Sequence, residues 1–265
     1  YRYLDLRRPR MQKILMPRAR VVQSIRNYFA EQGFVDLETP ILYKSTPEGA
    51  KEYLVPSRVH AGKFYALPQS PQVFKQLFMV AGFDKYIQIA RCFRDEDLRA
   101  DRQPEFTQLD LEMSFCTALE IQTHIEHCLR QTWQDAVGVD LPAPFRRMTH
   151  DETMTKYACD KPDLRFGLEM REIGDIAEQS DFGVFKNAVK AGGVIKGFSV
   201  PGRAEELTRK KIDELTAFVA ARGAKGLAWF KVENGALSSS IAKFFNADLQ
   251  KQIIALGTEA HIPLV

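Results

Sequence analysis

Polar and apolar residues alternate along two stretches within Tyr86–Met113, and this period of two is that of a β-strand. The apolar faces are Ile87, Ile89 and Phe93 in the first stretch, and Thr107, Leu109, Leu111 and Met113 in the second. The opposite faces are Gln88, Ala90, Cys92 and Arg94 in the first, and Phe106, Gln108, Asp110 and Glu112 in the second. We predict two strands joined by a long charged loop, with one face packed on a core. The other face is either a solvated surface or a ligand-binding surface, and its mixture of opposite charges with an aromatic ring favours ligand binding.

Helical periodicity marks three further elements in the first half of the chain. Apolar residues recur every three to four positions over residues 9–32, with Gly33 able to end the helix and Pro17 either kinking it or marking its true start. A second helix is predicted to follow Ser70 as N-cap, with Pro71 at its first position. The third begins at a capping box, Thr117-Ala-Leu-Glu120, and runs to about Val137.

The second half of the chain follows a proline-rich stretch at Leu141–Pro144, which is a candidate domain boundary. Its pattern predicts short helices and strands, namely a helix near Glu169–Gln179, strands near Phe182–Phe185 and Val194–Val200, a helix over Thr208–Arg222, a strand over Leu227–Val232, and a last helix capped by Asn246 and ending at Leu256. We therefore predict an α+β protein with a mostly antiparallel sheet in residues 1–150 and a smaller α+β module in residues 151–265.

Composition and charge exclude few functions. The chain has 265 residues, 45% of them hydrophobic and 27% charged, with a net charge of +3. Residues 1–26 contain eight basic residues and one acid, Asp5, so this segment is either a solvated helix face or a surface that faces polyphosphate or a partner. Four cysteines without a CxxC pair suit a reducing cytoplasm, and no apolar run predicts a signal region or a membrane span.

Common catalytic motifs are missing from the sequence. We find no Walker loop, no GxGxxG before a helix, no nucleophile elbow and no zinc signature. His124-x-x-His127-Cys128 lies within a helical pattern without a second ligand pair, so no metal-ligating residues are predicted. An arginine beside an aromatic ring suits a nucleotide, and nearby carboxylates suit an amine or a divalent cation. This combination allows in-line displacement at phosphorus, catalysed by orientation and electrostatics.

Several short sequences resemble those of a known enzyme class. Phe93-Arg94-Asp95-Glu96, followed by RQPEFTQLD at 102–110, resembles the second signature motif of the class II aminoacyl-tRNA synthetases, and residues 18–42, a helix leading to a strand that ends at Thr39-Pro40, resemble the first. TPEGA at 46–50 with LPQSPQVFKQ at 67–76 is similar to the aspartyl-tRNA synthetase family in particular. CDKPDLR at 159–165 and GAKGLA at 223–228 resemble the bacterial type of that family. The resemblance implies a partial antiparallel-sheet catalytic core with motifs 1 and 2 in residues 1–150, then a linker and an inserted GAD-type α+β domain in residues 151–265.

The same resemblance implies a two-step reaction. Aspartate and ATP would give aspartyl-adenylate and pyrophosphate, and the aspartyl group would then pass to the 3′ end of tRNA(Asp). Arg94 would be the catalytic residue at the α-phosphate. The ATP site would comprise Arg94, Asp95, Glu96, Gln103 and Phe106, with Phe106 stacked on adenine. The aspartate site would comprise Glu48, Ser70, Gln72, Lys75, Arg94 and Asp110, with Lys75 on the side-chain carboxylate and with Asp110 and the mobile Glu48 on the ammonium group. Mg²⁺ is inferred from ATP use together with the carboxylates of the sheet face, and a homodimer from motif 1. The cysteine content and the lack of a long apolar run predict a cytoplasmic location without membrane contact.

Parts of the family pattern are absent from this sequence. There is no anticodon-binding barrel and no third motif with its arginine, and the apolar run Ile262–Val265 lacks a polar tail. We therefore expect the chain to be truncated and inactive by itself. Two alternatives remain at this point: a synthetase-like paralogue with a binding or regulatory role, and a ligase that transfers aspartyl-adenylate to an acceptor other than tRNA.

Overall fold

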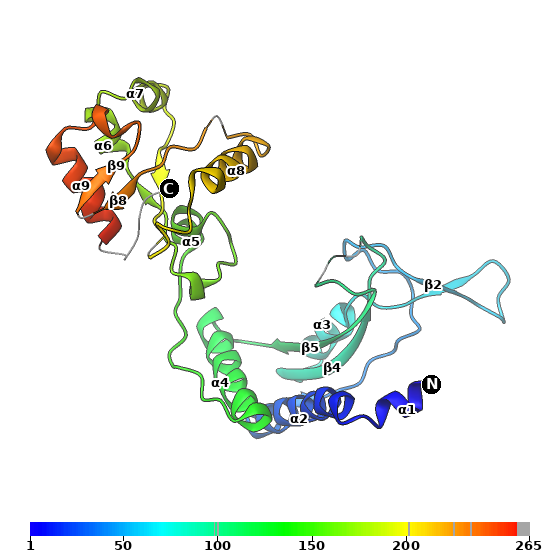
Figure 1. Ribbon diagram of the computed structural model, residues 1–265. Helices are drawn as coiled ribbons and strands as arrows, with labels where there is room; N and C mark the ends of the chain where they lie inside the picture. Colours follow the sequence, from blue (N-terminus) through cyan, green and yellow to red (C-terminus); the bar gives the residue numbers. More distant parts are fainter. Residues whose placement is uncertain (98, 100, 201, 225, 234, 259–265) are drawn as a thin grey trace. The chain divides into compact units, whose positions relative to one another are not determined.

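The computed structural model describes residues 1–265 except 98, 100, 201, 225, 234 and 259–265 (Figure 1). The chain divides into two compact units, Tyr1–Phe145 and Arg146–Val265, which are described separately. The terminal run Ile262–Val265, on which the expectation of truncation partly rests, lies outside the described residues. Within the described part of the chain, no helix combines the length and apolar character that crossing a bilayer requires.

The first unit contains helices and short strands around one long hairpin (Figure 1). Its elements are α1 (Arg2–Leu6), α2 (Pro9–Glu31), β1 (Val35–Asp36), β2 (Leu54–Pro56), β3 (Phe64–Ala66), α3 (Gln72–Val80), β4 (Lys85–Phe93), β5 (Glu105–Met113) and α4 (Ala118–Val137). The sheet order is β1-β4-β5, with β1 parallel and β5 antiparallel to β4, while β2 and β3 form a separate antiparallel pair.

The register of β4 and β5 confirms the predicted hairpin. Gln88 lies opposite Asp110, Ala90 opposite Gln108, and Cys92 opposite Phe106. Opposite residues in an antiparallel pair point to the same side of the sheet, so the two polar faces form one surface.

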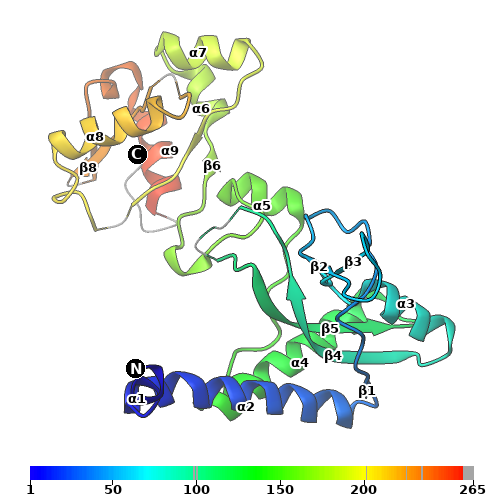
Figure 2. The ribbon, with the colours of Figure 1, turned by 90° about the vertical axis from the view of Figure 1, so that its right-hand side faces the viewer.

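Helices cover both sides of the hairpin (Figure 2). On the apolar side, α2 and α4 supply Tyr28, Phe29 and Cys128 to a cluster that contains Ile87 of β4 and is completed by partly buried residues of β5. On the polar side, α3 contacts both long strands. Burial of the apolar side stabilises the hairpin by roughly 25 cal/mol per Å² of apolar surface, and it thereby fixes which side chains face α3.

The ends of the helices agree in part with prediction. The capping box at Thr117 is present, with Gly138 in the left-handed conformation after α4. Pro17 lies inside α2, which begins at Pro9, so the alternative that it marks the start of the helix is wrong. Ser70 as N-cap is also wrong, because the cap position of α3 is Pro71 and no side chain caps this helix.

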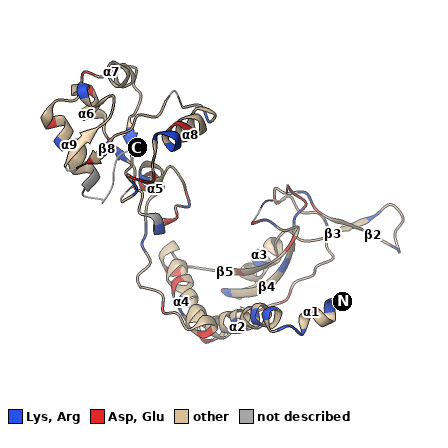
Figure 3. Ribbon diagram, viewed as in Figure 1, with Lys and Arg blue, Asp and Glu red and all other residues tan. Residues whose placement is uncertain are grey.

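Basic residues mark the N-terminal helices (Figure 3). Arg18 donates to Thr107 Oγ1 at 2.9 Å, Arg20 donates to the carbonyl of Ala136 at 3.3 Å, and Arg26 pairs with Asp36 at 3.1 Å. Part of the basic segment therefore anchors α2 to its own unit. Other members, such as Arg7, Arg10 and Lys13, are exposed.

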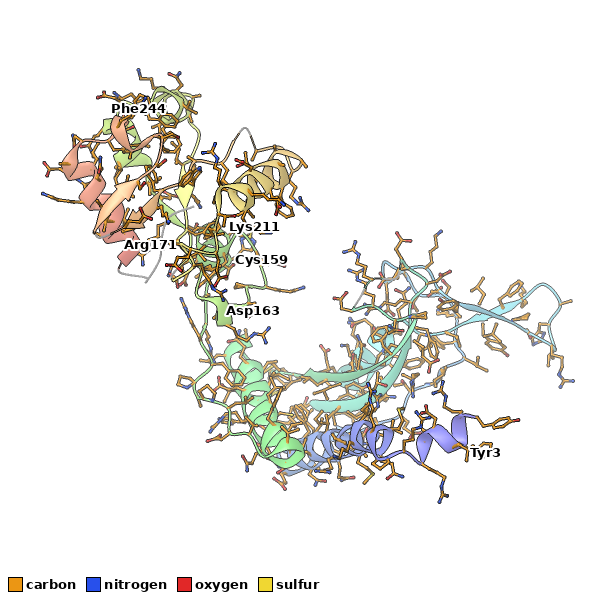
Figure 4. All side chains as sticks on the ribbon, viewed as in Figure 1. Tyr3, Cys159, Asp163, Arg171, Lys211 and Phe244 are labelled. Atoms are coloured by element: carbon orange, nitrogen blue, oxygen red, sulfur yellow. The ribbon has the colours of Figure 1, made fainter. Side chains whose placement is uncertain are left out.

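The second unit is a small α+β module. Its elements are α5 (His150–Tyr157), a 3-10 turn η1 (Leu164–Phe166), β6 (Arg171–Glu172), α6 (Gly174–Gln179), α7 (Gly183–Lys190), β7 (Lys196–Gly197), α8 (Arg209–Ala220), β8 (Lys231–Glu233), β9 (Ala236–Ser238), a second 3-10 turn η2 (Ala242–Phe244) and α9 (Ala247–Thr258). Its core joins Ile176, Phe230, Leu237 and Ile253 to other buried residues. Phe244 packs on this core, its ring centroid 5.4 Å from that of Phe182 (Figure 4).

Several predictions for this unit need correction. The segment predicted as a strand at Phe182–Phe185 is mostly the first turn of α7. The helix predicted from Glu169 begins only at Gly174, because Arg171–Glu172 pairs with β7. The strand predicted over Leu227–Val232 is confined to Lys231–Glu233. The helix predicted over Thr208–Arg222 is present as α8, with Thr208 at its cap position, and Asn246 caps α9 as predicted.

Candidate active site

The candidate site is the polar face of the β4–β5 hairpin, bordered by α3 and by the loop that carries Glu48. The site residues on β5 project from alternate positions, which places Phe106 near the loop end of the strand and Asp110 deeper. The structure brings Glu48 to this face from the loop at residues 46–50, Ser70 from just before α3, and Lys75 from within α3.

Lys75 forms an ion cluster with two carboxylates. Its Nζ lies 3.2 Å from Asp110 Oδ1 and 3.3 Å from Glu112 Oε2. The side chains of Lys75 and Asp110 are only 12% and 9% exposed, so this pair is screened by solvent much less than a surface pair.

Asp110 is held in an unfavourable environment for a charge. Burial raises the pKa of its carboxyl above the ordinary range; the cation of Lys75 opposes this rise, and the charges of Glu112 and Glu48 add to it. Asp110 Oδ1 accepts no hydrogen bond from the described residues despite its ion pair. A buried oxygen of this kind can accept a hydrogen bond from a ligand cation.

Arg94 and Phe106 lie together at the other end of the face. The guanidinium carbon of Arg94 is 5.1 Å from the centroid of the Phe106 ring, and the Arg94 backbone nitrogen donates to the carbonyl of Pro104 at 2.9 Å. The cation–π contact holds a planar donor group next to an aromatic surface, an arrangement suited to a phosphate attached to a flat base.

The loop at residues 46–50 carries Glu48 to the edge of the site. The Ser70 hydroxyl donates to Glu48 Oε2 at 2.6 Å, and the Thr46 hydroxyl donates to Oε1 at 3.0 Å. The predicted capping role of Ser70 is thus replaced by a contact that holds this carboxylate.

The remaining predicted site residues make fewer contacts with the polar face. Gln72 is half-buried at the start of α3. Asp95, Glu96 and Gln103 are exposed on the loop between β4 and β5, where Glu96 pairs with Arg102 at 3.2 Å. Among the described residues, Gln103 forms no hydrogen bond with Arg94 or Phe106.

Sequence reasoning missed Gln69, which is 2% exposed. Its side-chain carbonyl accepts from the Ala50 backbone nitrogen at 3.0 Å, and its amide nitrogen donates to the Ala50 carbonyl at 2.9 Å. Asp95 adds a third tie, because its backbone nitrogen donates to the carbonyl of Lys51 at 2.9 Å. The C-terminal end of the Glu48 loop is therefore fixed to the site. Gln69 lies in the LPQSPQVFKQ segment that resembles the aspartyl-tRNA synthetase family, but no periodicity in that segment distinguishes it from its neighbours.

A cavity of about 380 Å³ touches the hairpin at Gln88 and Ala90 and extends to Arg26 and Asp36. Because Gln88 and Ala90 belong to the polar face, the cavity borders that face, although Glu48, Lys75, Arg94, Phe106 and Asp110 do not line it. In the described part of the chain, no group of three His, Cys, Asp or Glu side chains is placed to hold a metal ion.

Comparison with known proteins identifies the family. The model of class II tRNA synthetases (D, K and N) matches residues 1–248. The chain belongs to this family. The RDE and EFTQLD segments of β4, β5 and their loop are therefore parts of a class II synthetase domain.

Within this family, the chain is similar to proteins named aspartate–tRNA ligase. The chain is 54% identical over 261 residues to the aspartate–tRNA ligase of Shouchella clausii, covering 98% of this chain and 44% of that protein. It is 57% identical over 254 residues to the aspartate–tRNA(Asp/Asn) ligase of Anoxybacillus flavithermus, covering 96% and 43%. The chain thus spans less than half the length of these relatives.

A solved structure also matches part of the chain. Asparaginyl-tRNA synthetase of Pyrococcus horikoshii, complexed with asparaginyl-adenylate, is 23% identical, with a TM-score of 0.47, over 52% of this chain and 32% of that one.

Proposed function

We propose that this chain belongs to an aspartate–tRNA ligase and supplies part of the site where ATP activates L-aspartate. The observation that carries the proposal is the polar face of the hairpin, which holds Arg94 and Phe106 at one end and the Lys75–Asp110 pair at the other. The identity of 54% and more to ligases of this name supports the choice of amino acid.

In the first step, a carboxylate oxygen of aspartate attacks the α-phosphorus of ATP. A new oxygen–phosphorus bond forms, the bond between the α-phosphorus and the bridging oxygen breaks, and pyrophosphate leaves with that electron pair. Arg94 stabilises the charge that develops on the α-phosphate, Phe106 stacks on adenine, and Asp95, Glu96 and Gln103 contact ATP from the loop. In the second step, the 3′-terminal ribose hydroxyl of tRNA(Asp) attacks the acyl carbon and AMP leaves.

The ion cluster suggests how aspartate is selected. Its side-chain carboxylate takes the place of Glu112 beside Lys75, and its ammonium group takes the free acceptor at Asp110 Oδ1. This exchange keeps each buried charge paired, which a neutral or oppositely charged side chain would not do. Glu48 approaches the ammonium group from its loop, and Ser70 and Gln72 border the same pocket.

The remaining parts of the proposal concern partners. Mg²⁺ enters with the phosphates of ATP, because Mg²⁺ is commonly held by one or two carboxylates together with substrate phosphates. We further propose a cytoplasmic homodimer formed through residues 18–42, and an inserted GAD-type domain after a linker within residues 151–265.

Pyrophosphate exchange tests the proposal directly. The full-length parent protein is expected to exchange pyrophosphate only with aspartate and ATP both present, and Arg94→Ala is expected to lower the rate at least about 100-fold. The 265-residue chain alone is expected to be inactive. Unchanged exchange in Arg94→Ala, or exchange with another amino acid in preference to aspartate, would overturn the proposal.

Transfer is tested separately by charging of tRNA(Asp). Charging by the full-length protein supports the ligase, whereas exchange without charging would point to an acceptor other than tRNA. Absence of both activities would favour a binding or regulatory role.

A further inference from the structure

Gln108 occupies the middle of the polar face and has no role in the site described above. It lies two residues from Phe106 and two residues from Asp110 on β5, so each neighbour is about 7 Å away along the strand. Opposite it on β4 is Ala90, whose side chain is a single methyl group. Gln108 is half-buried, which leaves part of its side chain open to a ligand over the small residue.

A buried thiol fixes the orientation of this amide. Cys92 is fully buried, and its Sγ lies 3.2 Å from Gln108 Oε1. Burial, with a smaller contribution from Asp110, raises the pKa of the Cys92 thiol to about 11. The thiol therefore keeps its proton at neutral pH and can donate it to the amide oxygen.

The amide nitrogen is thereby turned away from Cys92. The oxygen and nitrogen of a carboxamide lie on opposite sides of its carbon, and Nε2 carries two donor hydrogens. Among the residues that the structure describes, none accepts a hydrogen bond from Gln108 Nε2. Along the polar face, Gln108 lies between Phe106, which contacts Arg94, and Asp110, which pairs with Lys75.

We infer that Gln108 is a substrate-binding residue that donates from Nε2 to an acceptor oxygen of the bound aminoacyl-adenylate, and that Cys92 is a positioning residue acting through it. The acceptor lies between the base at Phe106 and the ammonium group at Asp110, so it is a ribose hydroxyl or the acyl carbonyl oxygen. A neutral donor suits this place, because a cation would compete with Lys75 for Asp110 and a carboxylate would repel the phosphate. The inference rests on the proposed function.

Substitution at Gln108 in the full-length protein tests the contact. Gln108→Met removes the donor at similar length, and Gln108→Glu replaces the amide by a carboxylate. Each is expected to lower kcat/KM for pyrophosphate exchange by about tenfold or more, which is the effect of losing one hydrogen bond to a polar ligand group. Gln122→Glu, on the exposed surface of α4, is the matched control and is expected to leave exchange unchanged.

Nucleotide analogues separate the two acceptors. If the contact is to the ribose, the loss caused by Gln108→Met disappears with 2′-deoxy-ATP or with 3′-deoxy-ATP. If it is to the acyl carbonyl, the loss persists with all three nucleotides. Wild-type kinetics in both Gln108 variants would overturn the inference while leaving the proposed function intact, whereas absence of exchange in the wild-type protein would overturn both.

Two substitutions at Cys92 test positioning. Cys92→Ser keeps a hydrogen-bond donor, whereas Cys92→Ala removes it. We expect Cys92→Ser to retain kcat/KM within about threefold and Cys92→Ala to fall about as far as Gln108→Met, with no further loss in the double variant. If Cys92 had only a structural role, the losses of kcat/KM in its variants would follow their losses of thermal stability. Wild-type kcat/KM in Cys92→Ala, or an equal loss in Cys92→Ser, would refute positioning by the thiol.

Discussion

Asp110 shows how one buried carboxylate couples stability to chemistry. Its folded-state pKa lies above the unfolded value, so the folded protein binds more protons over the pH range between the two. Stability contributed by protonated Asp110 is therefore present at low pH and is lost as pH rises through the raised pKa. The ionised form that the proposed site uses is the one that burial penalises.

Replacement of Asp110 by Asn should separate these effects. We expect Asp110→Asn to flatten the dependence of unfolding free energy on pH above about pH 4, without loss of stability near neutral pH, while pyrophosphate exchange falls about 10- to 100-fold. Urea unfolding at a series of pH values and exchange kinetics measure the two quantities. A steeper pH dependence in the variant would contradict the stated sign.

Arg94 should not be replaceable by lysine. Arg94→Lys keeps the charge but loses the planar group that stacks on Phe106, so KM for ATP is expected to rise about tenfold or more. Arg91→Lys is the control, because Arg91 pairs with Glu105 on the exposed rim. Equal KM values for ATP in Arg94→Lys and wild type would show that the charge alone matters.

At the level of single residues, the sequence correctly predicted which side chains share a face of a strand, because that follows from periodicity. Alternation was sufficient to place Phe106, Gln108 and Asp110 on one face, and the register confirms it. Alternation could not predict the role of Gln69, or that Ser70 would bond to Glu48 and not cap the helix. Both contacts are made with a loop about twenty residues earlier in the chain. The ligand roles of the site residues stay predictions.

At the level of elements, the Glu48 loop is held at both of its ends. Gln69 clamps Ala50 through two hydrogen bonds, while the residues before it are held by Glu48 itself and by Glu52, which accepts from the Thr46 backbone nitrogen at 2.8 Å. Movement of Glu48 with Ala50 fixed would therefore have to break its own hydrogen bonds with Ser70 and Thr46.

Gln69→Ala is expected to loosen the Ala50 end of the Glu48 loop. Loss of both bonds from a buried amide should lower the unfolding free energy by about 1–3 kcal/mol and raise KM for aspartate more than KM for ATP. Gln76→Ala, exposed on α3, serves as control. An equal rise in both KM values would argue against a specific effect on the Glu48 loop.

Long elements were predicted better than short ones, for a physical reason. α2, α4, α8 and the hairpin each repeat their period several times, whereas α7 and β6 are too short for a period to be read. At Phe182–Phe185, packing of the phenylalanines against Phe244 and Phe245 accompanies a helix where local pattern favoured a strand.

At the level of the whole molecule, the residues that the structure describes form two hydrophobic cores, one in each unit. Tyr28, Phe29 and Ile87 belong to one, and Phe230 and Ile253 belong to the other. Each unit can therefore gain its stability from its own buried surface.

Calorimetry should resolve two unfolding transitions. Ile253→Ala, at a fully buried position of α9, is expected to destabilise the second unit by about 2–5 kcal/mol and to leave the other transition in place. Phe29→Ala should do the reverse. A single transition shifted by both variants would show that the units unfold together.

The strict alternation along β4 and β5 also limits the insertions and deletions that these strands can accept. A one-residue insertion or deletion within either strand would exchange its two sides, burying Asp110 and Gln108 in the apolar cluster and exposing Leu109 and Leu111 to the ligand. The loop between the strands carries no such constraint. Natural variation in length should therefore fall between Arg94 and Glu105, and the strands themselves should vary only by substitution.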